Sequence, residues 1–121
     1  MSHEPSDIRE SIMMNLESSA DWRQGKAEEP PDDERNAAAA HELRKLAEGV
    51  AELEDDEYPL PQLAALHGRL GDDYGELVGE IESELLRQVG VYTSYDNAKA
   101  FLEALRKELD LLVARMRSDL H

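Results

Sequence analysis

Near the end of the chain, apolar residues recur at alternating intervals of four and three, a spacing that predicts a long amphipathic helix. We expect Thr93 or Ser94 to cap this helix. A second series with the same intervals predicts another long helix, from Asp33 to about Glu54. Each helix must bury its apolar face against other elements, so the two series favour a helical bundle. The first series is Ala98, Leu102, Leu105, Leu109, Leu112 and Met116, and the second is Ala39, Leu43, Leu46, Val50 and Leu53.

Shorter helices are expected elsewhere. Residues 6–18 should form a first helix, because Ile8, Ile12 and Leu16 recur every four residues after Ser6. Residues 18–33 contain two serines, a glycine and two prolines, a composition typical of a linker. Within this predicted linker, Trp22 is expected to pack back onto the domain as a core anchor.

After two prolines, a short helix is expected over residues 61–69, followed by a fourth helix that reaches Val89. Asp73 and Glu76 form a predicted capping pair for this fourth helix. No useful strand alternation occurs. We therefore predict an all-α fold, a small antiparallel bundle of three long helices plus one or two short ones. Residues 1–121 should form a single acidic domain, with a less regular segment at 1–33 and the bundle at 34–121.

The chain is strongly acidic, with a formal charge of −15 from 28 acidic and 13 basic residues. This charge argues against direct binding of nucleic acid, which requires a cationic surface, and against anionic membranes. No run approaches the roughly 18 apolar residues of a membrane span, and the start of the chain lacks a signal-peptide pattern. We expect a cytoplasmic protein. A salt-adapted source would be another explanation of the acidity.

Two acidic groups lie in the middle of the chain, where a basic protein surface is the expected partner. One group sits at the carboxyl end of the second predicted helix, where the helix dipole disfavours negative charge unless a cation is near. The other forms a stripe with a four-residue step along the fourth predicted helix. The candidate partner-binding residues are Glu54, Asp55, Asp56 and Glu57 in the first group and Asp72, Glu76, Glu80 and Glu84 in the second.

Glycines accompany the acidic stripe. Gly75 and Gly79 together should cost the helix about 2 kcal/mol relative to alanine, so a compensating role is expected. Close packing against another helix is the preferred interpretation.

Sites for chemistry are few. Without cysteine, thiolate metal sites and a cysteine nucleophile are excluded. Glu54-x-x-Glu57 resembles half of the magnesium pattern of all-helical nucleotide pyrophosphatases of the MazG type, but the Glu-x-x-Asp half is missing. No metal or cofactor is expected. An anion pocket is predicted before the last helix, comprising Tyr92, Thr93, Ser94 and Tyr95.

These features favour a non-enzymatic helical protein–protein interaction module, such as a small regulator, chaperone or inhibitor, that presents an acidic surface to a basic partner. A metal-dependent nucleotide hydrolase that uses the clustered carboxylates is one alternative. The other is an assembly element that forms a homodimer or larger homo-oligomer through the glycine flank or the last helix.

Overall fold

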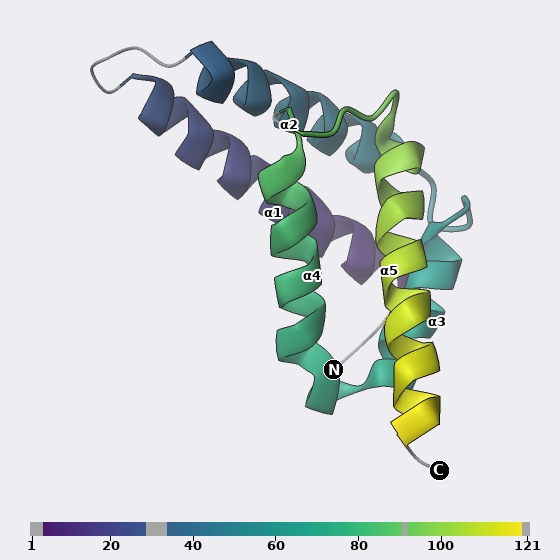
Figure 1. The fold of residues 1–121 in the computed structure, drawn as a ribbon. Coiled ribbons are helices and arrows are strands. Elements are labelled where there is room, and N and C mark those ends of the chain that lie inside the picture. Colours follow the sequence, from purple (N-terminus) through teal and green to yellow (C-terminus); the bar gives the residue numbers. More distant parts are fainter. Residues whose placement is uncertain (1–3, 29–33, 91, 120–121) are drawn as a thin grey trace.

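The regular elements of the chain are helices (Figure 1). The computed structural model describes residues 4–28, 34–90 and 92–119. Over these residues there is no β-strand, only an isolated bridge between Val89 and Thr93. The predicted all-α class is confirmed. The elements are α1 (Pro5–Ala27), α2 (Glu34–Glu52), α3 (Leu60–Leu70), the short 3-10 helix η1 (Asp72–Tyr74), α4 (Gly75–Gln88) and α5 (Ala98–Asp119).

The predicted linker is wrong over residues 18–27, because α1 continues unbroken to Ala27. The four-residue series of Ile8, Ile12 and Leu16 continues to Ala20, and all four side chains are buried. Helix α1 makes its most extensive contact with α2, and this packing outweighs the weak helix propensity of the two serines and Gly25. Residues 29–33 of the predicted linker lie outside the described residues.

Trp22 is not a core anchor, since 59% of its surface is exposed. It follows the fully buried Ala20 by two positions, and two residues turn a helix by about 200°. Its side chain therefore points to the opposite side of α1. Arg23 and Lys26 lie over its ring, at 5.5 and 5.6 Å from the ring centroid.

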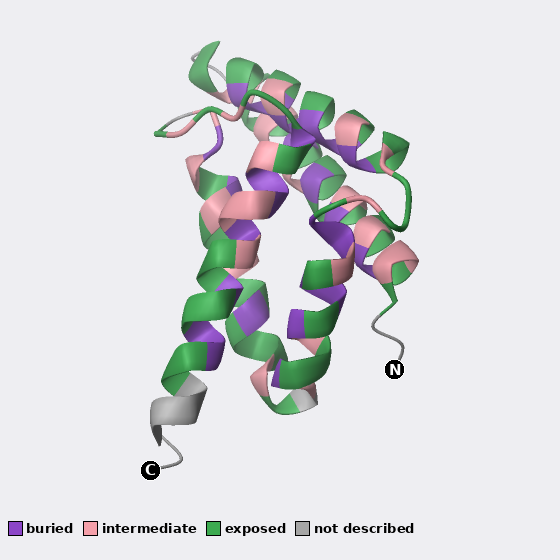
Figure 2. Ribbon diagram, turned by 90° about the vertical axis from the view of Figure 1, so that its right-hand side faces the viewer, coloured by how far each residue is buried: buried purple, intermediate pink, exposed green. Residues whose placement is uncertain are grey.

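One core cluster draws side chains from all five α-helices. Buried residues occupy the facing surfaces of the helices and exposed residues the outer surfaces (Figure 2). The two 4-3 series behave as predicted, apart from the half-buried Leu53 and the undescribed side chain of Met116. In Figure 1, α4 and α5 run beside each other and the α1–α2 hairpin crosses their upper ends. An antiparallel bundle of three long helices in a single domain stays a prediction.

Both predicted caps are wrong. Helix α4 begins after Tyr74 with no side-chain cap, so Asp73 and Glu76 do not act as a capping pair. Helix α5 begins at Ala98, where the Asn97 Oδ1 accepts a 2.9 Å hydrogen bond from the Ala100 N–H. Thr93 is instead held in the preceding turn, because its N–H donates to the Gln88 carbonyl oxygen over 3.0 Å.

Candidate functional site

The acidic segment Glu54–Glu57, called the acidic loop below, is bound to the rest of the chain through two of its four carboxylates. Asp55 forms an ion pair with Arg9 of α1, which also donates a 2.9 Å hydrogen bond to the carbonyl of Leu53. Glu57 lies 3.1 Å from Lys99 Nζ of α5. These cations offset the cost of placing negative charge at the carboxyl end of α2.

Glu57 also folds back on its own loop, where its Oε1 accepts a 3.0 Å hydrogen bond from the Glu54 N–H. This backbone donor, followed by the contact with Lys99, lowers the pKa of the Glu57 carboxyl. Glu54 and Asp56 remain exposed. The acidic loop is therefore partly a structural connector, with two carboxylates left for contacts outside the chain.

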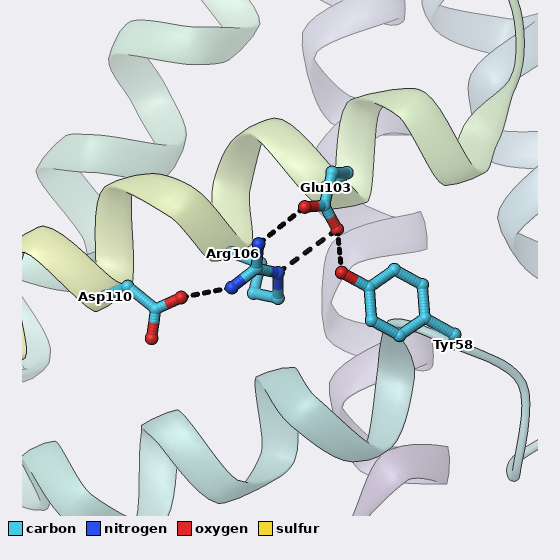
Figure 3. A network of polar contacts seen from close by, with 4 residues as sticks. All are labelled: Tyr58, Glu103, Arg106 and Asp110. Atoms are coloured by element: carbon cyan, nitrogen blue, oxygen red, sulfur yellow. Dashed lines mark hydrogen bonds and ion pairs between the residues drawn. The ribbon is translucent and has the colours of Figure 1, made fainter.

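A polar network joins Tyr58, the residue that follows the acidic loop, to α5 (Figure 3). The Tyr58 hydroxyl donates to the Glu103 carboxylate, which also accepts a 3.1 Å hydrogen bond from Arg106 Nε. Arg106 pairs in addition with Asp110. The contacts with Arg106 and Tyr58 lower the pKa of Glu103 to about 2, and Glu103 in turn raises the pKa of Tyr58. No local sequence pattern predicts this network, because Tyr58 and Glu103 lie 45 positions apart.

Three members of the acidic stripe, Glu76, Glu80 and Glu84, are exposed on a surface of α4 that we call the outer face. Glu84 is 2.5 Å from Arg87 and accepts a 3.2 Å hydrogen bond from Gln88. Glu76 and Glu80 form no ion pair with any described residue. The side chain of Asp72 lies outside the described part. The outer face comprises Gly75, Glu76, Gly79, Glu80, Ser83 and Glu84.

The glycines of the outer face are not packed against another helix of the described chain. A Cβ atom placed on Gly75 or Gly79 would meet no heavy atom within 4 Å. The expectation of close packing is therefore wrong within this chain, whereas packing against a second copy stays a prediction. Close approaches occur elsewhere: a Cβ on Gly49 would lie 2.8 Å from the Ala98 Cβ, and one on Gly90 would lie 2.6 Å from the Ala39 Cα.

The acidic loop and the outer face do not form one continuous surface. In Figure 1, α5 lies between α4 and the connection from α2 to α3 that contains the loop. Glu76 and Glu80 are neighbouring acids that form no ion pair with a described residue, as are Glu48 and Glu52 of α2.

The four residues of the predicted anion pocket do not converge. Tyr92 is 85% exposed, Ser94 Oγ donates a 2.8 Å hydrogen bond to Glu42 Oε1, and Tyr95 packs edge-on against Phe101. A cavity of about 200 Å³ beside Tyr95 is lined by two carboxylates, those of Glu42 and Asp96, as well as by Lys45. The acidic lining does not favour an anion.

The carboxylate positions give no support to the hydrolase alternative. Within residues 4–28, 34–90 and 92–119, no group of three or more histidine, aspartate or glutamate side chains is arranged to hold a metal ion. Glu57, the second glutamate of the Glu-x-x-Glu pattern, pairs with Lys99.

No described helix is long and apolar enough to cross a membrane.

Comparison with known proteins adds no relative. No protein-family model matches the chain, and neither does a curated protein or a solved structure. Function is therefore inferred from the contacts and charges of this chain. Among the described residues, the outer face of α4 combines neighbouring acids that form no ion pair with glycines that no other residue covers.

Proposed function

We propose that this chain is a non-enzymatic protein–protein interaction module, a small regulator, chaperone or inhibitor, whose outer face of α4 binds a basic partner surface. The observation that carries the proposal is the exposure of Glu76 and Glu80 without an ion pair in the described chain. Like charges four residues apart repel each other by a few tenths of a kcal/mol, and a basic partner would relieve this repulsion. Complementary charge would mainly speed association and select the partner.

The flat glycine surface supports the same proposal. No side chain rises from Gly75 and Gly79, and no other part of the described chain covers them. A partner backbone could therefore approach α4 closely between the acids. Glu54 and Asp56 of the acidic loop would form a separate, smaller contact. We place this module in the cytoplasm, where its partner would be another protein rather than a nucleic acid or a membrane.

Affinity capture from native lysate at low salt tests the proposal with two charge-matched variants. The first changes Glu76, Glu80 and Glu84 to glutamine. The second changes Glu10, Glu48 and Glu52, which are exposed acids on α1 and α2, to glutamine. Each variant loses three negative charges and moves the formal charge from −15 to −12. A basic protein held by the wild type and by the second variant, but lost from the first, is the expected result.

Equal capture by both variants would show that only the total charge matters, which would contradict a docking face. The purified partner should then bind with an association rate that falls as salt is added, because exposed charges are screened. A homodimer through the glycines is the competing use of the same face. Mass measurement in solution separates the docking face from the homodimer. A monomeric mass means that the outer face is free for a partner, whereas a dimer that Gly79→Leu dissociates means that a second copy covers this face.

A further inference from the structure

A groove of about 360 Å³ lies between α1 and α4 and borders the outer face, since Ser83 lines it, but neither Glu76 nor Glu80 does. Its volume is in the range of small-molecule sites. Trp22 and Arg23 line it from α1, and Leu86 and Arg87 line it from α4, with serine hydroxyls beside them. No carboxylate lines it, although the chain carries a formal charge of −15.

Arg23 differs from the other half-buried arginines of the described chain in its hydrogen-bond partners. Among the described side chains, three arginines are half-buried: Arg9, Arg23 and Arg106. Arg9 pairs with Asp55, and Arg106 pairs with Glu103 and Asp110. Arg23 instead donates to neutral oxygens, those of the Asn36 side chain at 2.9 Å and the Arg87 backbone at 3.0 Å.

Arg23 is therefore held in place by two hydrogen bonds and forms no ion pair with a described carboxylate. A guanidinium has five N–H donors, and the two hydrogen bonds leave donors for a further acceptor. Partial burial of a charge without an ionic partner costs free energy, which an arriving anion would recover. The same groove supplies the apolar surface of Leu86 and the exposed ring of Trp22.

We propose that this groove binds a small organic monocarboxylate with a planar apolar body. The carboxylate would accept hydrogen bonds from Arg23, and the planar group would pack against Trp22 and Leu86. A single negative charge is favoured over a polyanion because the field of the whole chain repels anions at long range. This inference goes beyond the proposed docking face, since it does not use Glu76 or Glu80.

Phenylacetate and its neutral isostere phenylacetamide are suitable probes. Trp22, the only tryptophan of the chain, lies in the groove and reports occupancy through its fluorescence, and calorimetry gives an independent affinity. We expect a saturable change with phenylacetate and about tenfold weaker binding of phenylacetamide, because hydrogen bonds to a charged group are stronger. Equal binding of the two probes, or no saturation by either, would overturn the proposal.

Variants of two arginines locate the contact. Arg23→Gln should lower the affinity for phenylacetate to that for phenylacetamide, whereas Arg44→Gln should leave it unchanged, since Arg44 is exposed and lies near Asp21. Circular dichroism confirms that each variant is folded. Wild-type affinity in Arg23→Gln would refute the role of Arg23. If that variant does not fold, the comparison of the two probes on the wild type still decides.

Glu76→Gln combined with Glu80→Gln separates this inference from the proposed function. The double variant keeps every residue that lines the groove, so phenylacetate should bind it with wild-type affinity. A tenfold loss in this variant would mean that binding depends on the outer face rather than on the groove alone, and would contradict the proposal. Binding of phenylacetate together with failure to capture a basic protein would leave the groove assigned and refute only the docking face.

Discussion

Two regions of the molecule carry the same residue types, glycine and clustered acids, in different surroundings. Around α2, Gly49 and Gly90 permit close approaches, and Asp55 and Glu57 pair with basic residues. On the outer face of α4, the glycines touch no other part of the described chain, and two acids form no ion pair with a described residue. The comparison teaches that a local pattern does not assign a role, because the role depends on what other segments bring to it.

The difference follows from the position of each region in the fold. Arg9 and Asp55 are 46 residues apart in sequence, and packing of α1 and α5 around the end of α2 brings cations to the acidic loop. Helix α4 makes its main helix contact with α5, and no described residue lies against the two glycines of its outer face. Substitutions in the two regions should therefore have opposite effects on stability.

The largest effect is expected at Gly90. Alanine there should destabilise the chain by about 3 kcal/mol, because φ is 77° and the added Cβ would lie 2.6 Å from the Ala39 Cα. Urea unfolding measures the loss. Gly71→Ala is the matched control, since Gly71 also has positive φ but open space around it. A loss at Gly90 no larger than the loss at Gly71 would refute the close approach.

Removal of the cation from the acidic loop should have the next largest effect. Arg9→Met should lower the free energy of unfolding by about 1–2 kcal/mol, because the Leu53 carbonyl and Asp55 each lose a charged donor. The same unfolding measurement on Arg44→Met serves as the control, as that arginine is more exposed. Equal losses would mean that the acidic loop is no better anchored than a surface ion pair.

On the outer face, a substitution should change the free energy of unfolding in the opposite direction. Gly79→Ala should stabilise the chain by about 1 kcal/mol, because a helix-interior glycine is replaced where nothing lies within 4 Å. Thermal unfolding and mass in solution should be measured together. A lower melting temperature, or a change of mass, would indicate that Gly79 is already in contact with a second copy.

Glu103→Gln should lower the melting temperature by a smaller amount, and the difference from the wild type should depend on pH. Since the folded pKa of Glu103 is about 2 against an ordinary 4.5, its carboxylate stabilises the fold above pH 4.5. This contribution is lost as the pH falls from 4.5 towards 2. The gap in melting temperature between wild type and variant should close over that interval. A gap that persists at the acidic end would mean that packing, not charge, explains it.

Much of the fold could be predicted from the sequence because it depends on local periodicity. The 4-3 series of α2 and α5 identified core residues such as Leu43, Leu102 and Leu105. The continuation of α1 could also have been recognised, since Ala20 extends the four-residue series of Leu16. The exposure of Trp22 can also be predicted once α1 is known to continue to Ala27.

The candidate sites could be predicted only in part, because their partners are distant in sequence. Nothing near Glu57 indicates that Lys99 neutralises it, and nothing near Tyr58 indicates Glu103. The acids of α4 were identified, but whether cations lay near them required the fold. Arg23 was missed for the same reason, since its acceptors lie on α2 and at the end of α4.

The smallest effect tests the comparison most directly. Glu80 repels both Glu76 and Glu84, each four residues away, so Glu80→Gln should stabilise the chain by a few tenths of a kcal/mol at low salt. Glu76→Gln should change stability less, because Glu76 lies in the first turn of α4, where the helix dipole favours its charge. Added salt should remove both differences.

The direction in which Glu80→Gln changes stability decides between two interpretations of α4. A stabilised variant means that the chain tolerates repulsion on an exposed face, which is the cost that a basic partner would relieve on binding. A destabilised variant would mean that Glu80 already meets a cation within the folded protein. The outer face would then resemble the acidic loop, and the contrast on which the docking proposal depends would be lost.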